Sequence, residues 1–333
     1  MLDLRDVARS ERCSARSSSN NDNYHWTKLN MNATRRDFLG RAAAATLLTS
    51  VPGWAMGRSS SSKLGRFACN SWPFRSYFDT PQMHEFRDAK YPLLDQADFP
   101  QFLADHFKIH NVEFLPQHFA ETDQPAIDKV KAGLKKANSR CCNLMGLELP
   151  GGVFARGRDP QATAKYADHW VGIAVTLGCP SITVALTGEG PVDPGVAAHN
   201  LTPVVDAAHR RGIKILFHND DMQHESAETL IAVIKKLGND RTGTCPDFGN
   251  FAPKSAAFAL SQLRMLAPYA STICHSKDGI AVHGKFYADD FPASMKVMHD
   301  TGFSGLYSLE FEGLDTPESG IRKLLALTEK YLT

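Results

Sequence analysis

Short apolar runs that end in polar residues recur along the chain and alternate with longer amphipathic stretches. The runs predict eight strands, at 66–70, 111–115, 142–149, 181–186, 214–219, 242–247, 271–276 and 306–311. Intervening stretches have helical spacing, and several of them end at Gly or Asn, as at Asn138, Gly178, Gly212, Gly238 and Gly302. Alternating strands and helices produce a parallel sheet with right-handed crossovers.

Eight such units predict an α/β protein with a single (β/α)8 TIM barrel over residues 66–333. An open doubly wound sheet would carry a Gly-rich phosphate turn after its first strand, whereas the sequence there is NSWPFRS. The aromatic segment from Arg75 to Leu94 is expected to cover part of the barrel mouth as a lid loop.

Four residues of the metal-binding type occur at matched positions of four successive units. They are His218, Asp247, His275 and Glu310, separated by 29, 28 and 35 residues. The repeat of a β/α barrel is about 31 residues, so each would lie at the C-terminal end of its strand, where parallel strands bring side chains to one mouth. Two imidazoles and two carboxylates there predict one divalent ion, such as Mn, Co, Mg or Zn.

The N-terminal region predicts an export signal rather than part of the fold. Residues 1–30 are polar and expected to be disordered or a misassigned start, with Met31 as the true start. Residues 31–57 contain Arg35-Arg36 and a short apolar run, and resemble a twin-arginine (Tat) signal peptide. Residues 58–65 form a linker. We therefore expect the Tat machinery as a partner, a periplasmic or secreted enzyme, and no stable membrane span.

Charge and cysteine content exclude some classes of function. The 37 Lys and Arg residues balance 36 Asp and Glu residues, which argues against nucleic acid as a partner. The seven cysteines lack zinc-ribbon or redox spacing, so we expect packing roles and no disulfide framework. A homo-oligomer is compatible with the sequence, which does not determine the oligomeric state.

The strand ends carry motifs that resemble the xylose isomerase-like TIM-barrel superfamily over residues 64–330. The motifs are VEF (112–114), FHND (217–220), PDFGN (246–250), HSKD (275–278) and SLEFE (308–312). This superfamily includes sugar isomerases, epimerases, inosose dehydratases and endonuclease IV. In its sugar epimerases, a Glu, an Asp, a His and a Glu on strands 5 to 8 bind the ion, and the two glutamates act as acid and base.

The chain departs from that epimerase pattern at strand 5, where His218 replaces the glutamate. An imidazole bound to a metal has no free lone pair, so the two-glutamate scheme cannot carry over intact. Glu310 remains as one catalytic carboxylate, and Glu312 is its rival on the same strand face. Catalytic candidates for the missing group are Glu148, His118 and Lys277, with substrate hydrogen bonding or structural pairing as alternatives.

The resemblance and the ligand set predict a metal-dependent sugar isomerase or epimerase that acts on a free sugar or keto-sugar through an enediolate. A keto-sugar lyase or dehydratase is the alternative that His218 favours. A non-catalytic sugar-binding barrel is a third hypothesis. A nuclease is a weaker hypothesis than these three, because Asn250 stands where endonuclease IV carries a further His ligand. Glu113 is expected to form a buried pair, and Trp72 to stack on a sugar or pack in the core.

Overall fold

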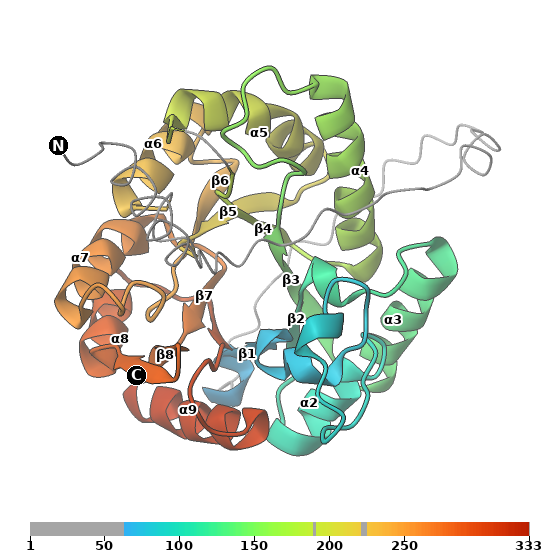
Figure 1. Cartoon of the computed structure of the whole chain (residues 1–333), viewed down its shortest axis with the longest axis vertical. Helices are drawn as coiled ribbons and strands as arrows, with labels where there is room; N and C mark the ends of the chain where they lie inside the picture. The colour runs from blue at the N-terminus through green and yellow to red at the C-terminus, as the bar shows by residue number, and fades with distance from the viewer. Residues whose placement is uncertain (1–62, 189–190, 221–224, 333) are drawn as a thin grey trace, which may run out of the picture. The chain divides into compact units, whose positions relative to one another are not determined.

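Eight parallel strands form the centre of the protein and helices surround them (Figure 1). The structure is a computed structural model that describes residues 63–188, 191–220 and 225–332. The strands are β1 (Phe67–Asn70), β2 (Asn111–Phe114), β3 (Arg140–Leu147), β4 (Ser181–Ala185), β5 (Lys214–His218), β6 (Thr242–Cys245), β7 (Ile273–Ser276) and β10 (Leu306–Leu309). Their order is β6-β5-β4-β3-β2-β1-β10-β7, so the predicted (β/α)8 barrel is confirmed.

The last contact of the barrel, between β6 and β7, differs from the others. Seven neighbouring pairs form parallel ladders, and two of these ladders, β2–β3 and β3–β4, contain a register shift. β6 and β7 instead meet at two isolated parallel bridges, Thr244 with Ala270 and Asp247 with His275. The backbone N–H of His275 also donates to the carbonyl of Pro246 at 2.8 Å. Two of the predicted metal ligands therefore face each other across this seam.

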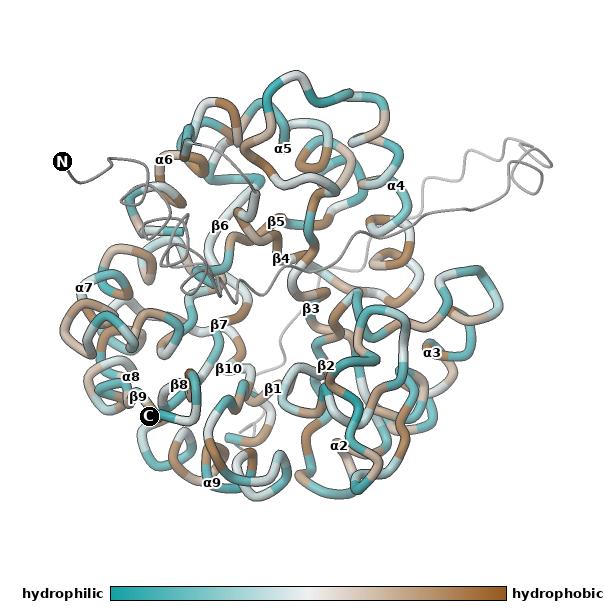
Figure 2. The backbone as a smooth tube through the Cα atoms, in the orientation of Figure 1, coloured by the Kyte–Doolittle hydropathy of each residue, from teal (hydrophilic) through white to brown (hydrophobic). Residues whose placement is uncertain are grey.

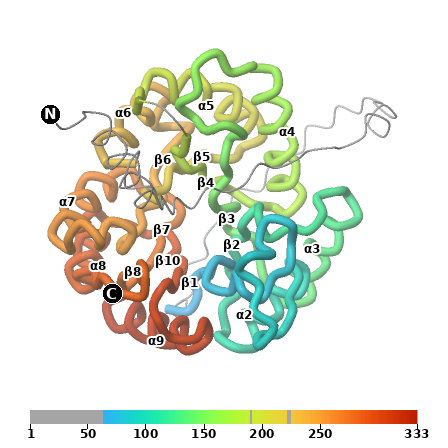
Figure 3. The backbone as a smooth tube through the Cα atoms, in the orientation of Figure 1, coloured from blue at the N-terminus to red at the C-terminus, as the bar shows by residue number. Residues whose placement is uncertain are grey.

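The helices follow the strands round the ring, and the colour gradient of Figure 3 runs once round it, bringing α9 beside β1. The helices are α2 (Phe99–Phe107), α3 (Gln124–Lys136), α4 (Pro160–Leu177), α5 (Pro194–His209), α6 (Ala227–Leu237), α7 (Ala256–Leu266), α8 (Phe291–Asp300) and α9 (Pro317–Tyr331). Six begin at an Asp or Ser whose side chain accepts a backbone N–H, namely Asp123, Asp159, Asp193, Ser226, Ser255 and Asp290.

Apolar residues line the strands and alternate with polar residues along the helix turns (Figure 2), as expected for helices that bury one face against the sheet. Trp170 of α4 and Ile321 of α9 belong to this core. The six cysteines in the described part of the chain are buried and form no disulfide, and they are Cys69, Cys141, Cys142, Cys179, Cys245 and Cys274. Their packing role agrees with the prediction.

Two features differ from the expected pattern of elements. β3 ends at Leu147 rather than at 149, because Gly146 adopts a φ of +73° and the register with β4 shifts between Leu144 and Leu147. A hairpin of β8 (Gly279–Val282) and β9 (Lys285–Ala288) lies between β7 and α8. The N–H of Ala281 donates to the carbonyl of Glu312 at 2.7 Å, which attaches the hairpin to the end of β10.

The segment after β1 is a packed wall of the barrel mouth and not a loose loop. It forms the 3-10 helices η2 (Trp72–Tyr77) and η3 (His84–Phe86). Phe74, Tyr77 and Phe78 are completely buried, and the Tyr77 ring stacks on Tyr91 with centroids 4.7 Å apart. Three more 3-10 helices are η1 (Lys63–Arg66), η4 (Pro116–His118) and η5 (Ala267–Tyr269).

The predicted signal peptide and the polar residues before it lie outside the described residues. Within the described ranges, no helix is both long enough and apolar enough to cross a lipid bilayer.

Candidate metal centre

The predicted ligands meet at the C-terminal ends of the strands. His218 closes β5, Asp247 follows β6, His275 lies within β7 and Glu310 follows β10. His218 Nε2 lies 2.9 Å from His275 Nδ1, and Asp247 Oδ2 lies 3.8 Å from each of these nitrogens. Glu310 Oε2 lies 3.2 Å from His275 Nδ1. All four side chains are buried, so a single small site joins residues that are 92 positions apart in the sequence.

Asp247 is held so that one carboxylate oxygen remains available. Its Oδ1 accepts the backbone N–H groups of Gly249 and Asn250, both at 2.8 Å. Its own backbone is fixed by Asn219, which accepts the Asp247 N–H at 2.7 Å and donates to its carbonyl at 3.0 Å. Oδ2 is buried and accepts no well-formed hydrogen bond from the described residues. Its nearest cation is the ammonium of Lys277, at 3.3 Å, so a metal ion bound here would share this oxygen with Lys277.

The donor set fits a divalent ion. The edges of a tetrahedral site with bonds of 2.0–2.1 Å are about 3.3 Å long. The distances among the His218, Asp247 and His275 atoms are 2.9 to 3.8 Å, which brackets that value, and Glu310 Oε2 lies 3.2 Å from His275 Nδ1. Imidazole nitrogens and carboxylate oxygens together suit Zn, Mn or Co, and carboxylates also suit Mg. His218, Asp247 and His275 form the tightest group.

Lys277 lies against the same carboxylates. Its Nζ is 2.7 Å from Glu310 Oε1, 2.6 Å from Glu312 Oε2 and 3.3 Å from Asp247 Oδ2. It also donates to Asn250 Oδ1 at 2.6 Å. The side chain is completely buried. Because Oε1 of Glu310 is occupied by this ammonium, only Oε2 faces the imidazole of His275, and that oxygen also accepts the amide of Asn70 at 2.5 Å.

Glu113 orients His275 from behind. Both of its carboxylate oxygens lie 3.2 Å from His275 Nε2. Ser308 donates to Oε2 and Asn143 donates to Oε1, each at 2.6 Å. A carboxylate that accepts the N–H of one ring nitrogen leaves the other nitrogen as a lone-pair donor. Glu113 thus favours the tautomer with the proton on Nε2, which leaves the lone pair of His275 Nδ1 for the site. The expected buried pairing of Glu113 is present.

The electrostatics of the cluster keep Asp247 ionised. Burial alone would raise the pKa of Asp247, but Lys277, His218 and His275 outweigh burial and hold the pKa well below its usual value. Burial would likewise lower the pKa of His218, yet Asp247 and Asp220 raise it to about 9. In the absence of an ion, the cluster therefore attracts protons to its imidazoles, and a divalent cation would replace that positive charge.

Two predicted catalytic residues lie apart from this cluster. Glu148 follows β3, and burial together with the charge of Asp220 raises its pKa to about 8. His118 of η4 is buried and stacks on Phe78 with centroids 4.4 Å apart. Burial and the charge of Arg75 lower the pKa of His118 to about 3. Neither ring nitrogen of His118 has a hydrogen-bond partner among the residues that the structure describes.

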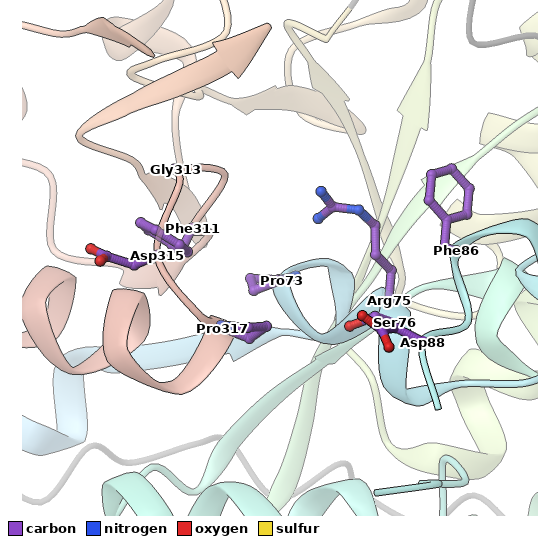
Figure 4. Close-up of a pocket in the computed structure, with 9 residues that line it drawn as sticks. All are labelled: Pro73, Arg75, Ser76, Phe86, Asp88, Phe311, Gly313, Asp315 and Pro317. Atoms are coloured by element: carbon purple, nitrogen blue, oxygen red, sulfur yellow. The ribbon is translucent and has the colours of Figure 1, made fainter. Parts of the chain in front are cut away.

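The outer side of the centre is formed by the wall after β1. The indole N–H of Trp72 donates to Glu312 Oε1 at 2.6 Å, and Lys277 holds the other oxygen of Glu312. The guanidinium of Arg75 lies over the Trp72 ring, 4.6 Å from its centroid. Figure 4 shows Arg75 and Phe86 beside one another on this wall, opposite Phe311 and Asp315 of the segment that joins β10 to α9.

A family comparison places the chain among known barrels. A model described as xylose isomerase-like TIM barrel matches residues 103–331, which include all four candidate ligands. The chain belongs to the xylose isomerase-like TIM barrel family. No curated protein sequence matches the chain significantly.

Solved structures share the fold at low sequence identity. A D-tagatose 3-epimerase-like protein is 12% identical with a TM-score of 0.61, and the match covers 80% of this chain and 97% of that one. A xylose isomerase-like protein from Mycobacterium smegmatis, in complex with magnesium, is 13% identical (TM-score 0.59, 80% and 98% covered). The probable 3-DHS dehydratase from Bacillus anthracis is 10% identical (TM-score 0.56, 78% and 98% covered). Members with different chemistry thus share this barrel.

Several residues that shape the site were not singled out as such from the sequence. Asn219 and Asn250 hold Asp247, Asn70 holds Glu310, and Asn143 holds Glu113. Two of these asparagines lie in the FHND and PDFGN motifs, so the motifs carry positioning residues as well as ligands. Nothing in the local sequence around Asn143 marks it, because its partner is set by the register of β2 and β3.

Proposed function

We propose that the protein is a divalent-metal-dependent sugar isomerase or epimerase that acts on a free sugar or keto-sugar. The observation that carries the proposal is the buried group of His218, Asp247 and His275, whose ligand atoms lie close together, with Glu310 Oε2 3.2 Å from His275 Nδ1. Family membership supports a sugar-processing enzyme. The D-tagatose 3-epimerase-like neighbour makes epimerisation a natural choice for the first assay.

An ion bound by these four residues would supply a positive charge that stabilises the enediolate of a hydroxy-ketone. The chain's own residues supply the rest. The three N–H groups of Lys277 are already taken by Glu310, Glu312 and Asn250, so its ammonium would position these carboxylates rather than contact the substrate. Glu148, with a pKa of about 8, is protonated at neutral pH and can deliver a proton. His118 is neutral and can donate or accept one hydrogen bond to a hydroxyl.

A keto-sugar lyase or dehydratase is the second candidate, and His218 favours it. The imidazole at the end of β5 is buried against His275 and Asp247. It therefore cannot serve as the opposite-face base that the epimerases' glutamate provides. A protonated Glu148 would instead assist the departure of a hydroxyl or glycosidic oxygen. The two candidates differ in products, because elimination yields an unsaturated or cleaved sugar and epimerisation yields an isomer of the same mass.

We also propose export by the twin-arginine route, because Arg35-Arg36 precedes a short apolar run. A folded protein with its ion already bound would be exported to the periplasm or beyond. Replacing both arginines by lysine should leave the full-length protein in the cytoplasmic fraction. A periplasmic location of that double variant would overturn this part of the proposal.

The central test is metal content and proton exchange. Purified protein, reconstituted with Mn, Co, Mg or Zn, should hold about one ion per chain. Asp247→Asn should lose the ion but keep the fold, because an amide oxygen can still accept the Gly249 and Asn250 N–H groups. Asp300→Asn, at an exposed surface pair, is the matched control.

The loaded protein should then exchange a carbon-bound proton of D-fructose, D-tagatose or D-psicose with deuterium from solvent. An ion in wild type together with mass-conserving exchange would support the isomerase or epimerase. Loss of water or cleavage would favour the lyase. Wild type without any ion after reconstitution would overturn the proposal.

A further inference from the structure

A cavity of about 270 Å³ lies on the outer side of the metal centre, between η2 and the segment that joins β10 to α9 (Figure 4). Its walls include Pro73, Arg75, Ser76, Phe86, Phe311 and Asp315. Neither the metal ligands nor the catalytic candidates line it. It is therefore a space distinct from the group of candidate ligands.

Two residues of the cavity wall are chain neighbours of a hydrogen-bonded pair at the centre. Phe311 in its wall precedes Glu312, and Pro73 follows Trp72. Trp72 Nε1 donates to Glu312 Oε1 at 2.6 Å, and Lys277 Nζ lies 2.6 Å from Glu312 Oε2. A ligand that occupied both the centre and the cavity would pass this pair.

Solvent exposure differs among the carboxylates that hold Lys277. The Glu312 side chain is 14% exposed, whereas Lys277 and Glu310 beside it are 0% and 3% exposed. Of these carboxylates, Glu312 thus lies nearest to solvent, and its chain neighbour Phe311 lines the cavity.

The lining matches a polyhydroxylated ring. Phe86, which also packs against Trp72 and Arg75, and the largely buried Phe311 add apolar surface to the cavity. Arg75 and Ser76 add polar groups. Arg75 donates one N–H to the Trp72 carbonyl, at 3.2 Å, and its guanidinium stacks on the indole. Its other N–H groups can donate to the hydroxyl groups of a ligand. Pockets that bind small polar ligands combine apolar walls with a few fixed polar groups in this way.

The charge of the cavity favours a neutral ring over an anion. Asp88 and Asp315 line it together with Arg75. Each of these acids has its own cation, since Lys90 and Lys323 each lie 2.7 Å from one of them. An anionic group would meet two carboxylates and only one guanidinium. Its volume is just below the 300–1,000 Å³ typical of sites for drug-sized molecules, so it suits a single ring.

We propose that this cavity binds a second, neutral sugar ring, so that the substrate is a glycoside whose reacting ring lies at the metal centre. The inference rests on the proposed function, because it places the reacting ring at that centre. The ring in the cavity would stay unchanged in isomerisation or epimerisation, and would be the leaving group if the enzyme eliminates a glycosidic oxygen.

Calorimetric titration of the manganese-loaded full chain tests the proposal. The ligands are cellobiose, maltose, lactose, sucrose and trehalose, each compared with its constituent monosaccharides. At least one disaccharide should bind at least tenfold more tightly than its monosaccharides. Equal affinities would overturn the inference, and so would tighter binding of glucuronate, which would indicate an anion site. If monosaccharides still exchange protons with solvent in that case, the proposed function stands.

Two variants assign the gain to the cavity. Asp315→Trp fills it from its exposed rim and gives up only a surface ion pair. Arg75→Met keeps an apolar stem over Trp72 and removes the donors. Both should abolish the tenfold gain with the manganese content unchanged, while Asp300→Trp, at an exposed pair on α8, should retain the gain. A gain that survives Asp315→Trp would overturn the proposal.

Discussion

Lys277 and Glu310 form a buried ion pair in which Nζ lies 2.7 Å from Oε1, while Oε2 of the same carboxylate lies 3.2 Å from His275 Nδ1. The two oxygens of Glu310 therefore serve different partners. The pair restricts Glu310 to one oxygen for any ion, and it keeps an ammonium beside the position where that ion would lie. Ligand geometry and protein charge are consequently linked through one side chain.

Removing the Lys277 charge should destabilise the protein strongly when no ion is bound. Lys277→Met leaves Asp247, Glu310 and Glu312 buried without their common cation. The free energy of unfolding should fall by roughly 3–5 kcal/mol, the usual cost of breaking a buried pair. Added Mn²⁺ should restore part of it, because the ion supplies positive charge at the same carboxylates. Urea unfolding with EDTA and with Mn²⁺ measures both effects.

Lys296→Met is the control for that experiment, because Lys296 pairs with Asp300 at 2.6 Å on the surface. Its loss should cost less than about 1 kcal/mol. An unchanged unfolding midpoint in Lys277→Met with EDTA would contradict the role assigned to the buried pair.

Replacing Glu113 should weaken metal binding without unfolding the barrel. Glu113→Gln keeps groups that can pair with Ser308 and Asn143 but no longer holds the His275 N–H with a full carboxylate charge. Loss of such a carboxylate behind a ligating His typically weakens metal affinity about 10–100-fold. Competition of the protein with a fluorescent chelator for Zn²⁺ gives the affinity. Ser308→Ala, which removes one hydrogen bond to Glu113, should have a smaller effect, and equal affinities for wild type and Glu113→Gln would refute the assignment.

Glu148 should make the protein less stable as pH rises. Its folded pKa of about 8 lies above the unfolded value near 4.5, so the folded state binds the proton more tightly. The stabilisation is complete below pH 4.5 and is lost as pH increases toward 8. Glu148→Gln cannot lose a proton, so it should match wild type near pH 5 and exceed it in stability near pH 8.5. Thermal unfolding across this range measures the difference, and parallel curves at every pH would count against the raised pKa.

The order of the elements followed from the sequence because each strand is a short apolar run in a regular βα alternation. The same regularity located the ligands, since a residue at the end of each buried strand must face the mouth. The βα repeat therefore predicts that His218, Asp247, His275 and Glu310 each lie at the end of a strand. In the structure His218, Asp247 and His275 form one buried group and Glu310 contacts His275, and the role of all four as ligands remains a prediction.

What the sequence could not supply depended on neighbours in space. Glu113 reaches His275 across the barrel, a relationship between residues 162 positions apart. The link between Trp72 and Glu312 likewise depends on how the wall after β1 packs. The β8–β9 hairpin did carry a local signal, because His283 and Gly284 form a two-residue turn with φ of 50° and 74° between apolar residues. The βα pattern does not predict this hairpin, because it leads one to expect a helix directly after the seventh strand.

The bridge between Asp247 and His275 contributes to closure of the barrel between β6 and β7. Every other strand boundary is a parallel ladder, but β6 and β7 touch at two isolated bridges, and the second joins two candidate ligands. An ion bound by these residues would link β6 to β7, the pair of neighbouring strands with the fewest backbone contacts. Metal binding and closure of the barrel would then be coupled. In the metal-free protein, β6 and β7 would be the first neighbouring strands to separate.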